Sequence, residues 1–458
     1  MNMDLFTFII TLALLQGVCL WVGGKSAKGL TSQDDYFLAS KTVRFFPLMM
    51  TFVATQIGGG FILGSAEEAY RYGFAGLCYP VGISLGLMAL GLGAGRKLAE
   101  FEVATIAELL EVVYGSKTLK KVASLLSMVS LFMVLVAVII ASHKFMVSLG
   151  AGSTLWFILF WSVVIFYTVN GGLKAVVATD VIQALFFIVV FFASLAYAIA
   201  TSSLSCGSVI SQGFEGMANA TVSQIQGGLL MPLLFMIIGQ DMGQRCFAAK
   251  SPQIASRATL CAGVCALFVA IIPVYFGVLA KSLGITIPNG ASVLMATVEQ
   301  TTNPVLMALV ACAVLAAVVS TADSLINAIS SNLAQDFDLK IFQKKESIRT
   351  VKIVTAIISV MAIFFSFYGT SIIGIMVQSY ELSLSCLFIP ICASLFRRRG
   401  NFISALFAMV LGGFSFCLFQ FITPPFSKEV LSIFVSFGGY LIGEVIAKLL
   451  EKTEVKQV

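Results

Sequence analysis

The stretch that decides the fold reads Phe52-Val53-Ala54-Thr55-Gln56-Ile57-Gly58-Gly59-Gly60. It is apolar enough to lie in a membrane, yet it holds an amide and three consecutive glycines. Each glycine lowers helix stability by about 1 kcal/mol relative to alanine, so the triplet predicts locally unwound backbone with free carbonyl groups. Irregular backbone at membrane depth is tolerated only where it lines a cavity or a site. The stretch therefore indicates a transporter, unless its glycines serve only close helix packing.

A second apolar stretch supplies the oxygens that the first one lacks. It reads Ala316-Ala317-Val318-Val319-Ser320-Thr321-Ala322-Asp323-Ser324. Ala317, Ser320 and Thr321 stand at i, i+3 and i+4, so they share one helical face. With the carbonyl groups of Ala54 and Ile57, they complete a five-oxygen cage for sodium, a hard cation that accepts neutral oxygen ligands. Alternatively, the two hydroxyls bond back to carbonyls of their own helix.

The composition places the chain in a membrane. Of its 458 residues, 59% are hydrophobic and 11% are charged, whereas soluble domains carry roughly 25% charged residues. The ten cysteines form no CxxC pair, and a single histidine leaves no set for a zinc cluster or for an enzyme that needs paired imidazoles. We therefore expect a polytopic membrane protein that is not an enzyme and does not bind nucleic acid.

Thirteen segments are long and apolar enough to be candidate membrane spans. They lie near residues 4–22, 45–66, 74–94, 122–148, 154–170, 177–200, 226–240, 257–280, 304–330, 351–369, 371–396, 402–422 and 429–449. Most basic residues, Arg245 and the run 397–399 included, lie in the odd-numbered connections, which are cytoplasmic if the N-terminus lies outside. The excess of basic residues in cytoplasmic loops therefore predicts an outside N-terminus and a cytoplasmic C-terminus. The lack of a long glycosylated loop favours a bacterial inner membrane.

Two spans with polar, glycine-rich breaks organise the chain. The first is span 45–66, and the second is span 226–240, which ends in Gly239-Gln240-Asp241-Met242-Gly243. Each begins a group of five spans, and because five is odd, the second group must be inverted relative to the first. Broken helices at matching positions of inverted halves mark a transporter's binding site. We predict one membrane domain over 1–458, with an N-terminal helix and loop (1–44), two inverted repeats (45–200 and 226–396) and a C-terminal helix pair with a tail (397–458).

Four stretches of the chain resemble the sodium:solute symporter family, which includes the sodium–glucose, proline, pantothenate and sialic acid carriers. They are residues 54–60, 170–183, 239–251 and 315–323. The resemblance implies an all-α membrane fold with a leucine-transporter-type core of two inverted five-helix repeats. It also implies that Ala54, Ile57, Ala317, Ser320 and Thr321 hold sodium, in agreement with the spacing argument.

The same resemblance places Asp180 on the path by which sodium leaves. Taken by itself, Asp180 lies near the cytoplasmic start of its span, where it can receive a departing cation or cap the N-terminus of the helix. Both roles remain open at this point.

Candidate solute contacts gather at the two breaks. We expect Gln56, Gly58 and Gly59 at the first break and Gln240 and Asp241 at the second to line a central cavity. Asp241 departs from several relatives and is either an extra cation ligand or a partner for an amine of the solute.

Two further candidates lie away from the breaks. Gln378 resembles a substrate position in the tenth core helix, and we expect it to face the same cavity. Lys144 stands where family members that carry carboxylates often have a basic residue, so it either pairs with a solute carboxylate or extends to the outer headgroups. Glu67, Glu68 and Arg71 are expected to form a network in the outer vestibule.

The sequence thus predicts a sodium-coupled symporter that imports a small organic solute, an amino acid or a carboxylate, by alternating access. Na⁺ is its expected coupling ion, and its expected partners are the solute and the lipid bilayer, with no obligatory protein partner. The alternatives are a sensor that keeps the transporter fold and a carrier that uses protons or no ion. The short tail after the last span favours a carrier over a sensor.

Overall fold

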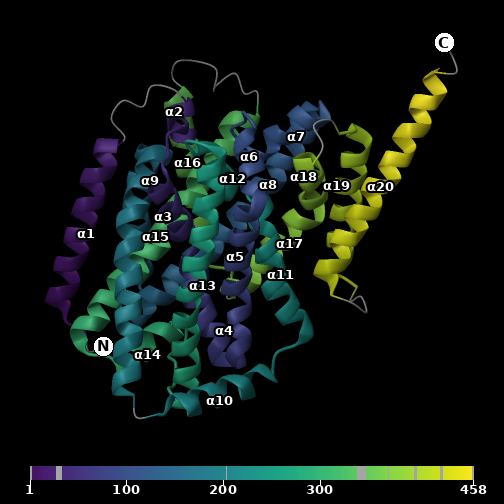
Figure 1. The fold of residues 1–458 in the computed structure, drawn as a ribbon. Coiled ribbons are helices and arrows are strands. Elements are labelled where there is room, and N and C mark those ends of the chain that lie inside the picture. Colours follow the sequence, from purple (N-terminus) through teal and green to yellow (C-terminus); the bar gives the residue numbers. More distant parts are fainter. Residues whose placement is uncertain are drawn as a thin grey trace.

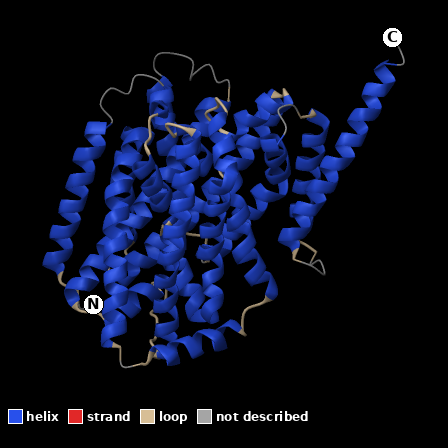
Figure 2. Cartoon of the chain, viewed as in Figure 1, coloured by secondary structure: helices blue, strands red, loops and turns tan. Residues whose placement is uncertain are grey.

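The computed structural model describes residues 3–26, 33–202, 204–337, 347–369, 371–396, 400–422 and 427–455. These residues form helices and their connections, with a single isolated bridge between Val43 and Ala249 in place of any strand (Figure 2). The prediction of an all-α architecture is confirmed. The basic run 397–399, predicted to be cytoplasmic, lies outside the described residues.

The helices of the first half of the chain follow one another without long connections. They are α1 (Leu5–Ser26), α2 (Gln33–Leu38), α3 (Phe45–Gln56), α4 (Ser65–Tyr72), α5 (Cys78–Ala89), α6 (Gly95–Glu100), α7 (Ile106–Tyr114), α8 (Lys117–Ser148), α9 (Thr154–Thr201) and α10 (Cys206–Met217). Short 3-10 or π-helical turns lie between some of them, namely η1 (Ala39–Lys41), η2 (Gly60–Gly64), η3 (Gly73–Leu77) and η4 (Leu90–Ala94).

The second half begins after α10. Its helices are α11 (Val222–Ile238), α12 (Gln240–Ala248), α13 (Pro252–Ser282), α14 (Val293–Thr301), α15 (Pro304–Asp336), α16 (Ser347–Ser366), α17 (Ile372–Ser383), the π-helical turn η6 (Leu384–Phe388), α18 (Ile389–Phe396), α19 (Phe402–Leu418) and α20 (Lys428–Val455).

The helices fit the predicted membrane spans. Within the described ranges, nine helical stretches are long and apolar enough to cross a membrane, and four shorter apolar helices accompany them. Each of the thirteen predicted spans overlaps one or more of these stretches. Spans 154–170 and 177–200 fall on the single long helix α9, which is kinked at Gly172, where φ is +61°. The number of crossings and the division into two repeats remain predictions.

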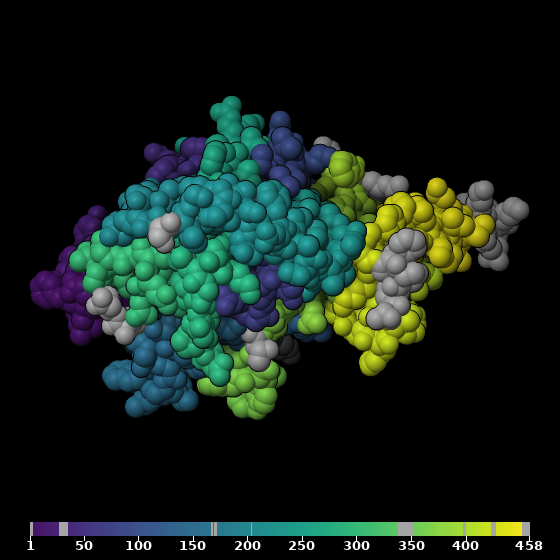
Figure 3. Space-filling model, turned by 90° about the horizontal axis from the view of Figure 1, so that it is seen from below, coloured from purple at the N-terminus to yellow at the C-terminus, as the bar shows by residue number. Residues whose placement is uncertain are grey.

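The centre of the bundle is α15, and its margins are the first and last helices. In the most apolar 18-residue stretch of α15, 83% of the residues are buried, whereas in that of α1 only 11% are buried. Helix α1 stands at one edge of the bundle and the pair α19 and α20 at the other (Figures 1 and 3). Polar residues of α15 are therefore enclosed by protein, which is where charged and hydroxyl side chains are tolerated at membrane depth.

Glycines allow close contact between α5 and α11. A Cβ atom on Gly82 would lie 2.4 Å from the carbonyl oxygen of Leu229, and one on Gly86 would lie 2.5 Å from that of Leu233. Small residues at helix contacts are common in membrane proteins because they let two backbones approach. At this contact the glycines therefore serve helix packing. The sequence analysis left the same role open for the glycines at residues 58–60.

Candidate sodium and solute site

The first helix break lies where the sequence predicted it. Helix α3 ends at Gln56, Ile57 leaves the helical region with φ −85° and ψ 68°, and the π-helical turn η2 begins at Gly60. A Cβ atom on Gly58 would lie only 2.0 Å from Thr321 Oγ1. Glycine is therefore required at residue 58, because it brings the unwound segment directly against α15.

The oxygens of this break and of α15 form a compact cluster. Ser320 Oγ donates to the Ala54 carbonyl at 2.9 Å, and Thr321 Oγ1 donates to the Thr55 carbonyl at 3.0 Å. Both hydroxyls also lie 3.1 Å from the Ala317 carbonyl of their own helix. Each hydroxyl thus bonds back along α15, as the alternative interpretation expected, and also across to α3. That these oxygens hold sodium stays a prediction.

The donor set of this cluster suits sodium. Four of the five predicted ligands, Ala54, Ala317, Ser320 and Thr321, lie within hydrogen-bond distance of at least one other member. Ser320 is fully buried and Thr321 is 6% exposed. Neutral carbonyl and hydroxyl oxygens in a buried cluster are ligands for a hard cation, which would replace the hydrogen bonds between them. Ile57, the fifth predicted ligand, occupies the break itself.

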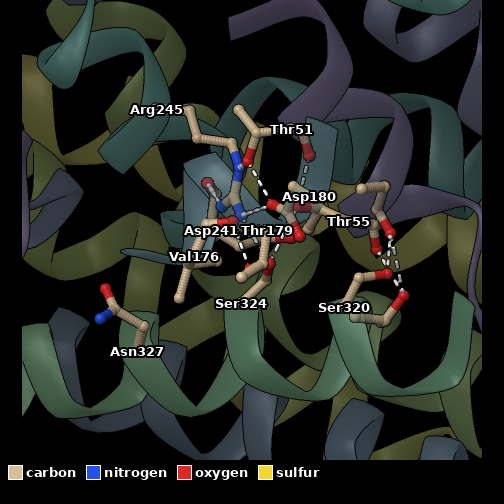
Figure 4. A network of polar contacts seen from close by, with 12 residues as sticks. Thr51, Thr55, Val176, Thr179, Asp180, Asp241, Arg245, Ser320, Ser324 and Asn327 are labelled. Carbon is tan, nitrogen blue, oxygen red and sulfur yellow. Dashed lines mark hydrogen bonds and ion pairs between the residues drawn. The ribbon is translucent and has the colours of Figure 1, made fainter. Parts of the chain in front are cut away.

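A buried ion network adjoins the oxygen cluster (Figure 4). Its centre is Arg245 on α12, which has no exposed surface. Arg245 Nη2 lies 3.7 Å from Asp180 Oδ2 and donates to Ser324 Oγ at 2.6 Å, while its Nε donates to Thr51 Oγ1 at 3.1 Å. Thr51 Oγ1 in turn donates to Asp180 Oδ2 at 2.5 Å. The network therefore joins α3, α9, α12 and α15.

The placement of Arg245 corrects the sequence analysis. We expected this residue in a cytoplasmic loop, but helix α12 continues the second broken span and buries Arg245 completely. A charged side chain at such a position is tolerated because Asp180 and three oxygen acceptors surround the guanidinium. A basic residue just after an apolar span can belong to the core if the helix restarts beyond the break.

Asp180 lies inside α9, eight residues beyond the Gly172 kink, and does not cap a helix. The alternative role as an N-cap is therefore wrong. Its carboxylate is fully buried, and the Oδ1 atom has no hydrogen-bond partner among the described residues. Asp180 is linked to the oxygen cluster through Arg245. The guanidinium of Arg245 contacts Ser324 Oγ, which in turn lies 3.0 Å from Thr55 Oγ1.

The second break separates α11 from α12 at Gly239 and faces the first. Gln56 Nε2 of α3 donates to Asp241 Oδ2 of α12 at 3.1 Å, so the two breaks are joined by a hydrogen bond. Gln240 points elsewhere: its Oε1 accepts from the Ile106 backbone N–H at 2.7 Å, at the start of α7. Gln240 thus positions α7, whereas Asp241 turns toward the centre.

A small cavity lies between the two breaks. Its volume is about 20 Å³, enough for about one water molecule. Its wall is formed by Thr55, Gln56, Gly58, Gly60, Phe61, Tyr79, Leu131, Val134, Phe235, Asp241, Thr321, Leu325, Met376 and Tyr380. Of the seven predicted solute residues, Gln56, Gly58 and Asp241 line this cavity. Gly59 packs on α8 instead, where an added Cβ would lie 2.7 Å from that of Ala141.

Two predicted solute residues lie away from the cavity. Lys144 Nζ forms an ion pair with Glu67 Oε2 at 2.6 Å, and Arg71 reaches the other oxygen of Glu67 at the same distance. Lys144 therefore belongs to the vestibule network expected of Glu67 and Arg71. Gln378 is exposed on the outer face of α17, because Met376 and Tyr380, two residues before and after it, face inward. The expectation that Gln378 lines the cavity is wrong.

The aromatic part of the site escaped the sequence analysis. Tyr79, Phe235 and Tyr380 come from α5, α11 and α17 and meet in the cavity wall. The rings of Phe235 and Tyr380 are stacked with centroids 4.3 Å apart, and those of Tyr79 and Tyr380 with centroids 6.4 Å apart. The chain is 12% aromatic, so no local signal separates these three residues from aromatic side chains that face lipid.

Solved structures share this fold. A substrate-bound, outward-open Na⁺-coupled sialic acid symporter matches with a TM-score of 0.77 and 18% identity, over 96% of this chain and 97% of that one. MhsT in complex with L-phenylalanine matches with a TM-score of 0.55 and 12% identity, over 87% and 98%. The chain therefore shares the leucine-transporter-type fold of these structures.

Sequence comparison narrows this class further. The family model described as "Sodium:solute symporter family" matches residues 36–412, and the chain belongs to that family. It is 25% identical to the sodium/pantothenate symporter of Haemophilus influenzae, over 98% of this chain and 97% of that protein. It is 26% identical to a high-affinity choline transporter of Caenorhabditis elegans, over 88% and 75%. Its match to the Drosophila melanogaster choline transporter, at 24% identity, covers 65% of that protein.

Proposed function

We propose that this protein couples the inward movement of Na⁺ to the import of a small organic solute. The observation that carries the proposal is the oxygen cluster at the first helix break. Ser320 Oγ and Thr321 Oγ1 of α15 contact the Ala54 and Thr55 carbonyls of α3. These contacts are possible because residue 58 is a glycine, since a Cβ atom there would clash with Thr321. Membership of the sodium:solute symporter family supports the same function.

In this proposal, Ala54, Ile57, Ala317, Ser320 and Thr321 hold the ion. Binding links α3 and α15 through the ion, because the ligands come from both helices and the hydroxyls exchange hydrogen bonds for a shared cation. Asp180 then receives the departing ion, and its unpartnered Oδ1 supports that role. The inward Na⁺ gradient and the membrane potential drive the cycle, the potential contributing about 2.3 kcal/mol per charge for each 100 mV.

The enclosed cavity supports transport by alternating access. With a volume of about 20 Å³ it is too small for an organic solute, so helices must part on one side to admit one. On the predicted outer side, Lys144 of α8 is paired with Glu67 of α4. On the predicted inner side, Asp336 at the end of α15 accepts hydrogen bonds from Thr105 and Ser124, at 2.5 and 2.7 Å. Opening either side requires breaking one of these contacts.

The proposed solute is an amino acid or a carboxylate, as expected from the sequence. An amine on the solute has better support than a carboxylate. Asp241, the expected partner of an amine, lines the cavity, whereas Lys144, the expected partner of a carboxylate, is bound to Glu67. We also propose an outside N-terminus and a cytoplasmic C-terminus in a bacterial inner membrane. The two chain ends lie at opposite ends of the bundle, as an odd number of crossings requires (Figure 1).

Uptake into proteoliposomes tests the proposal. An inward Na⁺ gradient should drive accumulation of one class among labelled amino acids, carboxylates, choline and sugars, and an equal K⁺ gradient should not. Accumulation that follows a proton gradient and ignores Na⁺ would establish the proton-coupled alternative. Solute binding without transport under any gradient would favour the sensor.

A further inference from the structure

Asp241 is a buried carboxylate with half of its hydrogen-bonding capacity unused. It is 3% exposed, and its Oδ2 atom accepts a hydrogen bond from Gln56. The Oδ1 atom has no partner among the residues that the structure describes. A buried charge is costly unless it is paired, so an ionised Asp241 carboxylate favours a cationic partner in addition to the Gln56 amide.

The nearest basic residue is committed to other groups. Arg245 contacts Asp180, Thr51 and Ser324 through its guanidinium, and it reaches only the backbone carbonyl of Asp241, at 2.9 Å. Within the described chain, no ion pair joins Arg245 to the Asp241 carboxylate. Asp241 stands in the first turn of α12, where the helix dipole favours a negative charge. When ionised, the carboxylate contributes a negative charge to the cavity.

The remaining wall of the cavity is aromatic and apolar. Tyr79, Phe235, Tyr380 and Phe61 line it, and no lysine or arginine is among its described lining residues. Aromatic rings attract ammonium groups through their negative faces, most strongly where water is excluded. They offer little to a small metal ion, which takes several oxygen ligands. A carboxylate set among rings therefore suits an organic ammonium ion.

We propose that the transported solute carries an ammonium group, that Asp241 is its counter-ion, and that Tyr79, Phe235 and Tyr380 enclose its alkyl groups. The inference rests on the proposed function, because it takes the central cavity as the solute site. It narrows the substrate to amines and quaternary ammonium compounds and excludes simple carboxylates and sugars. Asp241 acts by binding, and the five oxygens of the sodium cage remain separate from it.

Thermal unfolding of the purified protein with defined probes tests this inference. The probes are methylammonium, tetramethylammonium and choline, and 3,3-dimethyl-1-butanol is the neutral isostere of choline. We expect choline to raise the melting temperature, with the isostere binding on the order of 10- to 100-fold more weakly. An equal effect of the isostere, or no shift with any of the three ammonium probes, would overturn the inference without the need for any variant.

The variant Asp241→Asn keeps the size of the side chain and removes its charge. We expect it to lose the response to the ammonium probes and, because an unpaired buried charge is removed, to melt no lower than the wild type without ligand. The matched control is Glu100→Gln, which removes an exposed carboxylate paired with Arg96. Glu100→Gln should respond as the wild type does, and a full choline response in Asp241→Asn would contradict the assignment.

Repeating the series in Na⁺ and in K⁺ separates this inference from the proposed function. An ammonium response in K⁺, with no effect of Na⁺ on stability or uptake, would sustain the ammonium site and refute sodium coupling. A Na⁺ response together with stabilisation by pantothenate or glucose alone would sustain the symporter and refute the ammonium site. If Asp241→Asn altered the Na⁺ response and left the choline response intact, Asp241 would be an ion ligand, and the inference would fail.

Discussion

The two broken helices resemble each other in backbone and differ in chemistry. The break after α3 exposes neutral groups, the carbonyls of Ala54 and Thr55, to the hydroxyls of Ser320 and Thr321. The break before α12 brings charged side chains, Asp241 and Arg245, into the same buried region. An unwound segment at membrane depth thus provides an opening, and the flanking side chains decide what can occupy it.

We expect the charged break to contribute more to stability than the neutral one. Replacing Arg245 with methionine leaves Asp180 without its cation, and we expect a loss of about 3–5 kcal/mol in the free energy of unfolding. Denaturation of the purified variant followed by size-exclusion chromatography measures this loss. Arg257→Met, at an exposed arginine of α13, is the control and should change stability by no more than about 0.5 kcal/mol. Equal effects of the two substitutions would show that the network is not structural.

At the neutral break, the close contact between the unwound segment and α15 matters more than charge. In Gly58→Ala the new methyl group would lie 2.0 Å from Thr321 Oγ1, so α3 and α15 must separate. We expect about 1–3 kcal/mol of destabilisation from overpacking and the loss of the Na⁺ effect on melting. Gly438→Ala, at a glycine of α20 with open space around it, should leave both unchanged. If the Gly58→Ala variant kept a normal Na⁺ response, the oxygen cluster would not be the Na⁺ site.

The first break could be predicted from sequence because its signals are local. Three glycines beside Gln56 disfavour helix, and the spacing of Ala317, Ser320 and Thr321 fixes their common face. The placements of Arg245, Gln378 and Lys144 depend on tertiary contacts. The helix that buries Arg245 restarts after a break, the rotation of α17 turns Gln378 outward, and Glu67, which binds Lys144, lies 77 residues earlier.

The aromatic wall shows the same limit. Tyr79, Phe235 and Tyr380 are far apart in the chain and meet only when α5, α11 and α17 pack together. The sequence alone does not distinguish these three rings from rings that face lipid. The oxygen cluster at the first break was therefore largely predictable, whereas the candidate solute cavity required the structure.

A third pair of variants concerns the ion pair between α8 and α4, at the predicted outer end of the bundle. Lys144 and Glu67, each 16% exposed, form an ion pair between α8 and α4. A double-mutant cycle with Lys144→Met and Glu67→Gln should give a coupling energy of about 1 kcal/mol. Because neither residue lines the cavity, we expect the apparent affinity for the solute to change little. The exposed pair Arg96 and Glu100 should show no measurable coupling, and a large loss of solute affinity in Lys144→Met would restore its predicted role as a solute contact.

The central claim is that the neutral break binds Na⁺ through the hydroxyls of α15. The most direct measurement compares the melting temperature in Na⁺ and in K⁺ for the wild type and for the variant Ser320→Ala/Thr321→Val. The control is Ser162→Ala/Thr201→Val, at two exposed positions of α9. Na⁺ at about 10 to 100 times its dissociation constant should stabilise the wild type and the control by roughly 1.4–2.7 kcal/mol, and the Ser320/Thr321 variant should show no Na⁺ effect. The same Na⁺ shift in a folded Ser320/Thr321 variant would contradict the claim.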